Sequence, residues 1–136
     1  MNSPEALPSS LGLLEEVSGA EVEACRQKAS QIFHERTDYW SRQMGVRYNQ
    51  IRIKDQRTLW GSCSRDGNLN FNWRVIMAPP EVLDYLVIHE LAHLLEMNHS
   101  RRFWAHVGLW CPEHHVQRRW LRENSRELRV LEANRQ

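Results

Sequence analysis

The sequence predicts an α+β domain in which a small antiparallel sheet packs on a buried helix, with further helices on its flanks. Apolar and polar residues alternate through residues 50–54 and 68–73, as they do in strands that have one buried face. Residues 80–97 are apolar on nearly every side, which is typical of a central, buried helix. The chain has 136 residues, which suits one domain with one core.

Composition indicates an ordinary globular domain. Hydrophobic residues make up 41% of the chain, charged residues 26%, and the net charge of +1 favours no polyanionic partner. We expect no membrane partner, because no apolar run approaches the roughly 20 residues of a membrane helix and the N-terminus does not resemble a signal peptide. The three cysteines lie far apart without a C-x-x-C pair, which fits a cytoplasmic protein.

The first element is a helix. Residues 1–19, which include Pro4, Pro8 and Gly19, are expected to form a loose N-terminal segment, and residues 20–136 a single domain. Between residues 20 and 44 an approximate apolar stripe that includes Phe33 is flanked by charges, which predicts a helix. Gly45 is a plausible stop, because glycine favours the helix C-cap.

The strands follow. Leu69, Phe71 and Trp73 should point to one face and the intervening asparagines to the other. Asp66-Gly67 between two strand-like segments is a strong hairpin signal, so residues 58–64 should pair antiparallel with residues 68–73.

Three helices complete the domain. Two adjacent prolines, Pro79 and Pro80, can start the buried helix. Ser100 can cap a second helix over residues 101–110. A third can begin near Pro112, and arginines within residues 118–129 are expected to form a solvated face of it.

The buried helix carries the segment HELAHLLEMNH, residues 89–99. His89 and His93 are four residues apart, so they share one face about 6 Å apart along the axis and can reach one tetrahedral zinc ion. Glu90 can reach a water on that metal as a general base. Polar groups among large apolar residues need such a partner, although two helix histidines alone are usually structural.

His99 decides whether the site is complete. A straight helix would turn it about 120° away from the face of His93, so it can join the same metal only if the helix stops first. Asn98 tolerates the left-handed C-cap conformation, which predicts a corner at Met97 and Asn98. The histidine spacing of 0, 4 and 10 also occurs in metzincins, but Glu96 replaces their glycine and no Met-turn follows.

At this point the chain resembles a known family. Residues 57–104 contain, in order, WGSC, NW, APPEV-DY, VIHELAHL and NHS--FW. These resemble the YgjP-like predicted metal-dependent hydrolases, relatives of the SprT-like and WLM zinc metallopeptidases, over about residues 51–120. The resemblance implies His89, His93 and His99 as ligands of one Zn²⁺ per chain, Glu90 as catalytic base and a zincin or minigluzincin-like fold. One departure is the N-terminal part, a single predicted helix where family members carry a longer β-rich segment.

Other residues are weaker candidates. Zincins commonly hold a substrate as an added strand, and Trp60, Gly61 and Ser62 form the candidate edge, where Gly61 either admits a peptide backbone or forms a bulge. A group must also stabilise the oxyanion of the reaction. The sequence does not choose among the candidates Arg57, Tyr85, His114 and His115.

The function that we expect is a zinc metallopeptidase acting on peptide or protein amide bonds. One alternative is a metal-dependent nuclease, because an RNA endonuclease family shares the histidine spacing, although Glu90 replaces its glycine. Another is a binding module that keeps zinc for stability. A nucleic-acid partner is a minority interpretation, based on the eight arginines against four glutamates in residues 101–136.

Overall fold

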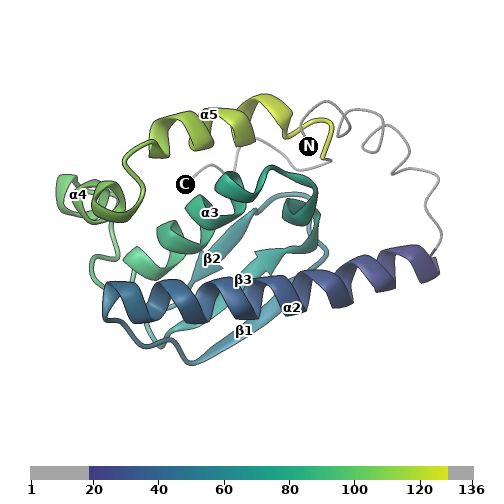
Figure 1. Cartoon of the computed structure of the whole chain (residues 1–136), viewed down its shortest axis with the longest axis horizontal. Helices are drawn as coiled ribbons and strands as arrows, with labels where there is room; N and C mark the ends of the chain where they lie inside the picture. The colour runs from purple at the N-terminus through teal and green to yellow at the C-terminus, as the bar shows by residue number, and fades with distance from the viewer. Residues whose placement is uncertain (1–18, 129–136) are drawn as a thin grey trace.

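The computed structural model describes residues 19–128, and the predicted loose segment 1–19 lies outside this range except for its last residue. The fold is α+β, as predicted: a three-stranded sheet is combined with helices before and after it (Figure 1). The elements in chain order are α2 (Gly19–Met44), β1 (Gln50–Lys54), β2 (Gly61–Cys63), β3 (Asn68–Asn72), the 3₁₀ helix η2 (Trp73–Met77), α3 (Pro80–Ala92), α4 (Arg101–Trp110) and α5 (His114–Asn124).

The sheet has the order β1-β3-β2 and is mixed, not wholly antiparallel as predicted. The predicted hairpin is present, because β2 pairs antiparallel with β3 and aligns Gly61 with Phe71. β1 instead pairs parallel with β3 and aligns Ile51 with Leu69. The chain passes from β1 to the far edge before the hairpin returns β3 to the middle, so β3 runs in the direction of β1.

The hairpin turn has the chemistry that the sequence predicts. The amide of Gly67 donates to the carbonyl of Ser64 at 3.0 Å, and Gly67 has a φ of 85°, where a side chain would be strained. The Ser64 hydroxyl accepts a hydrogen bond from the amide of Asn68 at 3.1 Å. The turn therefore fixes the register that brings β2 to the edge of the sheet.

The core lies between the sheet and the helices α2 and α3. The buried strand residues Leu69 and Phe71 point into it, and the rings of Phe33 on α2 and Phe71 stack with centroids 4.3 Å apart. α2 ends at Met44, and Gly45 follows with a φ of 69°, as predicted for the stop. The long helix α2 therefore packs on one face of the sheet.

α3 is the central helix. Pro79 occupies its N-cap and Pro80 its first position, and ten of its residues are buried. It contacts α2 on one side and α5 on the other (Figure 1). α4 begins where predicted, because the Ser100 hydroxyl accepts a hydrogen bond from the amide of Phe103 at 3.3 Å. No helix among residues 19–128 is long and apolar enough to cross a membrane.

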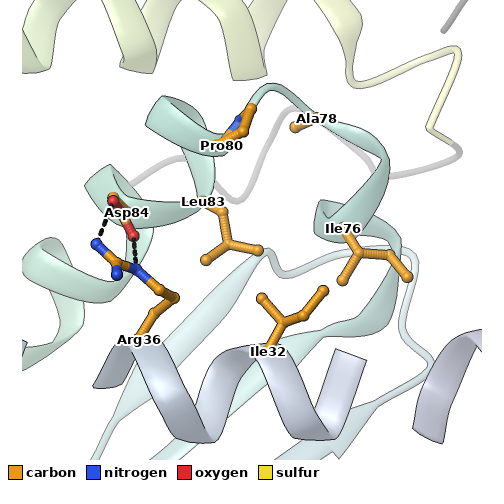
Figure 2. Close-up of a pocket in the computed structure, with 7 residues that line it drawn as sticks. All are labelled: Ile32, Arg36, Ile76, Ala78, Pro80, Leu83 and Asp84. Atoms are coloured by element: carbon orange, nitrogen blue, oxygen red, sulfur yellow. Dashed lines mark hydrogen bonds and ion pairs between the residues drawn. The ribbon is translucent and has the colours of Figure 1, made fainter. Parts of the chain in front are cut away.

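A cavity of about 400 Å³ lies between α2, η2 and the start of α3 (Figure 2). Its walls are mainly apolar and include Ile32 and Leu83, and none of the three candidate ligand histidines lines it. At one side Arg36 donates two hydrogen bonds to Asp84, at 2.8 and 2.9 Å. This ion pair joins α2 to α3 and fixes the position of the central helix.

The stacking of Phe33 on Phe71 predicts a large stability effect. Phe33→Ala should lower the free energy of unfolding by about 3–5 kcal/mol, because it leaves a cavity in the core. Urea unfolding of the metal-free proteins measures this, with the exposed Lys28→Ala on the same helix as control. A loss below about 1 kcal/mol for Phe33→Ala would show that this contact does not hold α2 against the sheet.

Candidate metal centre

Three imidazoles converge at the C-terminal end of α3. His89, His93 and His99 each offer a ring nitrogen, and these nitrogens all lie within 4.8 Å of one another. Nε2 of His99 is 3.3 Å from Nε2 of His89. His89 and His93 are buried and His99 is exposed, so the cluster is open on one side.

The convergence depends on where α3 ends. The helix ends at Ala92, earlier than predicted, and the chain bends at Met97 and Asn98, where the corner was predicted. The amides of His93, Leu94 and Leu95 then make bonds of the i to i−3 type, to Glu90, Leu91 and Ala92. These tighter turns and the bends at Met97 and Asn98 that follow them separate His99 from the helix axis, and His99 lies against His89. The straight helix that would have separated the histidines is not formed.

Hydrogen bonds orient the rings of the two helical histidines. Nδ1 of His89 lies 3.2 Å from the Tyr85 hydroxyl, and Nδ1 of His93 lies 3.3 Å from the carbonyl oxygen of Glu96. The carbonyl can only accept, so Nδ1 of His93 carries the proton and its Nε2 has a free lone pair. Contacts of this kind fix the tautomer of histidines that bind metals.

Aromatic rings from α4 form a wall behind the histidines. The ring of Phe103 stacks on that of His93 with centroids 4.4 Å apart and meets those of His89 and His99 edge-on at 4.8 and 4.9 Å. The ring centroid of Trp104 lies 5.6 Å from that of His89 and 6.3 Å from that of His99. The wall holds the imidazoles in place and shields one side of the cluster from water.

Two of the three histidines, His93 and His99, favour their neutral forms. The pKa of His93 is lowered by burial and then by the nearby His99. The pKa of His99, whose ring is only partly covered, is lowered by that partial burial and then by the positive charge of Arg118. Neutral imidazole is the form that binds a metal ion, so this cluster of three nitrogens fits a divalent cation that accepts nitrogen ligands.

Glu90 lies fully buried beside the cluster. Neither of its carboxylate oxygens has a hydrogen-bond partner among the described residues, and burial raises its pKa to about 8. A buried carboxylate without partners is costly, so it needs a partner that is supplied from outside the chain. A bound cation and its water would supply one, which is a second observation that fits a metal here.

The structure explains the glycine of the candidate edge strand. A Cβ on Gly61 would lie 3.1 Å from Oε2 of Glu90 and 3.1 Å from the carbonyl oxygen of Asn70. Gly61 therefore makes room for the Glu90 carboxylate, a reason that the sequence did not indicate. β2 is an edge strand, as expected, but the side chain of Trp60 is buried and the Ser62 hydroxyl accepts a hydrogen bond from Asn70.

The structure separates the four oxyanion candidates. Arg57 and His115 are exposed. Tyr85 is buried, and its hydroxyl contacts Nδ1 of His89, the ring nitrogen opposite the one that faces His99. His114 stacks on Trp104 with centroids 5.2 Å apart, which brings it closer to the cluster than its sequence context indicated.

Comparisons with known proteins show first the fold and then the family. The solved structure titled as the metallopeptidase zymogen of Pyrococcus abyssi abylysin superposes with a TM-score of 0.62 and 22% identity, over 73% of this chain and 98% of that one. The domain thus has a metallopeptidase fold. Residues 14–124 match the YgjP-like metallopeptidase domain, and the chain belongs to the YgjP-like family, a family of metal-dependent peptidases. No curated protein sequence matched significantly.

The contact between Tyr85 and His89 predicts an effect on metal affinity. Tyr85→Phe removes the hydroxyl and should weaken metal binding about 10- to 100-fold, because His89 loses the group that orients it. Competition with a chelator measures this, with Tyr39→Phe, an exposed tyrosine on α2, as control. Equal affinity in wild type and Tyr85→Phe would remove the orienting role of Tyr85.

Proposed function

We propose that this domain is a zinc-dependent peptidase that hydrolyses amide bonds of peptides or proteins, with Glu90 as general base. The observation that carries the proposal is the convergence of three imidazoles beside a buried carboxyl group without a partner among the described residues. A set of three protein ligands that is open on one side is typical of catalytic zinc, whereas structural zinc is usually closed by four. Membership of a metallopeptidase family supports the same reaction.

His89, His93 and His99 are the residues that would hold the ion, one per chain. Three imidazoles suit zinc better than magnesium or calcium, which prefer oxygen ligands. When bound, such an ion lowers the pKa of a coordinated water to about 7 and polarises the scissile carbonyl. The backbone carbonyl of Glu96 and the hydroxyl of Tyr85 keep two of the rings in the ligand orientation.

Glu90 moves the proton in this proposal. Its carboxylate takes one proton from the attacking water while the water oxygen bonds to the carbonyl carbon. The same proton then passes to the amide nitrogen as the C–N bond breaks, so Glu90 returns to its starting state. Burial raises the pKa of the Glu90 carboxyl, and the charge of a bound cation would favour the ionised form that accepts the proton.

The substrate backbone is proposed to lie along the free edge of β2. This strand is at the edge of the sheet, and a Cβ added to Gly61 would lie 3.1 Å from Oε2 of Glu90. An extended peptide that pairs with β2 would therefore pass beside the carboxylate. Recognition would come from the backbone of residues 60–62, because Trp60 is buried and Ser62 is occupied by Asn70.

The metal assignment predicts a composition. Purified protein should carry about one zinc ion per chain, and His93→Ala should lose it, because two imidazoles hold zinc poorly. Elemental analysis after gel filtration measures the content, with His34→Ala, an exposed histidine on α2, as control. Full zinc occupancy in His93→Ala would rule out the three-histidine site.

The role of Glu90 predicts a loss of turnover without a loss of metal. Glu90→Gln should reduce kcat/KM for peptide cleavage by about 10²–10⁴-fold, because the amide cannot accept the proton. A peptide library read by mass spectrometry measures cleavage, with Glu81→Gln, exposed on the same helix, as control.

The same experiment separates the alternative functions. Zinc-loaded Glu90→Gln with undiminished peptide cleavage would contradict the mechanism. Cleavage of RNA and not of peptides by the wild-type protein would indicate the nuclease. Bound zinc with neither activity would leave a zinc-stabilised binding module.

A further inference from the structure

One face of α5 covers the aromatic wall beside the metal centre. His114 and Arg118 are four residues apart on this helix and therefore share a face. The guanidinium carbon of Arg118 lies 4.9 Å from the ring centroid of Trp104, and the His114 ring stacks on the same indole. Trp104 in turn packs against His89 and His99. Arg118 is thus one aromatic ring away from the candidate metal ligands.

Arg118 has no anionic partner within the described part of the chain. Arg36, Arg42 and Arg74 each form an ion pair with an aspartate, whereas Arg118 makes none with a described residue. Its Nε is buried and makes no hydrogen bond to any described residue. A half-buried guanidinium with a free donor is unfavourable unless a negative group satisfies it.

The position of this charge is unfavourable for metal binding itself. Arg118 is close enough to His99 and Tyr85 to act on both electrostatically. A positive charge beside a cation site repels the ion that the site must hold. The charge becomes favourable when an anion lies within reach of the guanidinium, as when a carbonyl oxygen of the substrate becomes an oxyanion.

We propose that Arg118 is a catalytic residue that stabilises the oxyanion of the tetrahedral intermediate by donating from its guanidinium. This inference rests on the proposed peptidase function. The indole of Trp104 holds the guanidinium by a cation–π contact, so that the donor is already oriented before the substrate arrives.

The other candidates are less suited to this task. His114 shares the face, but burial and then the charges of His115 and Arg118 lower its pKa, so it is neutral and has one proton to donate. Arg57 and His115 are exposed, and Tyr85 is engaged with His89. Arg118 alone among these combines a permanent charge, a free buried donor and an aromatic support near the cluster.

Kinetics of peptide cleavage give the first test. Arg118→Ala should lower kcat about 100-fold and change KM little, because the oxyanion forms only in the reaction. Arg118→Lys should recover part of kcat, since it keeps the charge but not the planar guanidinium. Arg119→Ala, the exposed neighbour on α5, is the matched control, and His114→Ala is the competing candidate. Near wild-type kcat in Arg118→Ala, or the main loss in His114→Ala, would overturn the inference.

Two binding measurements separate catalysis from a structural role. Zinc affinity of Arg118→Ala should equal or exceed that of the wild type, because a like charge is removed. A phosphinic peptide, which mimics the anionic intermediate, should bind Arg118→Ala about 100-fold more weakly by calorimetry, while an uncleaved ground-state peptide binds both proteins alike. Weakened zinc binding, or equal affinity for the phosphinic peptide, would contradict the proposal.

The binding data also distinguish the inference from the function on which it rests. If wild-type protein binds the phosphinic peptide through Arg118 yet cleaves no peptide, the proposed function fails and the anion site stands. If wild-type protein cleaves peptides and Arg118→Ala does so equally well, the function stands and the role of Arg118 is refuted.

Discussion

The change in backbone direction after Ala92 is the constraint on which the candidate site depends. A helix places His89 and His93 one above the other, but it cannot place His99 on the same side ten residues after His89. The tighter hydrogen bonds that follow Ala92 end the helix without a glycine or a proline. They leave Nε2 of His99 3.3 Å from Nε2 of His89, and an open side remains at the cluster.

Burying the polar groups around the histidine cluster costs free energy unless they have hydrogen-bond partners. Some of these groups have such partners in the protein and others do not. His89 and His93 each have a hydrogen-bond partner at Nδ1, and aromatic rings of α4 pack against them. Glu90 and Arg118 receive much less, since the carboxylate oxygens of Glu90 and Nε of Arg118 have no partner among residues 19–128. Unsatisfied groups of opposite charge near one cluster are what a hydrolytic site needs, because the reaction supplies their partners.

Local signals in the sequence were sufficient for much of the fold. Asp66-Gly67 with the alternation of residues 68–73 predicted the β2–β3 hairpin, and Pro80, Ser100 and Gly45 marked helix ends correctly. The direction of β1 was not predictable, because a period of two residues identifies a strand but not its neighbour. The end of α3 was placed too late, because the first stop signal in the sequence is Asn98, whereas the helix already ends at Ala92.

For the candidate site, too, some residues could be predicted from the sequence and others could not. The histidines and Glu90 were recognised from their spacing, which is a local property of the helix. Tyr85 was considered only for the oxyanion, although its position four residues before His89 places it on the same helix face. Arg118 was grouped with solvated arginines, and only its packing on Trp104 distinguishes it from exposed neighbours such as Arg119.

X-ray absorption at the zinc edge tests the central claim most directly, because it reports the atoms around the ion. The zinc-loaded wild-type protein should show three imidazole nitrogens at about 2.0–2.1 Å and one further light ligand. His99→Ala should show one imidazole fewer. An unchanged spectrum in His99→Ala, or a sulfur ligand in the wild type, would mean that the turn after Ala92 does not complete the metal site.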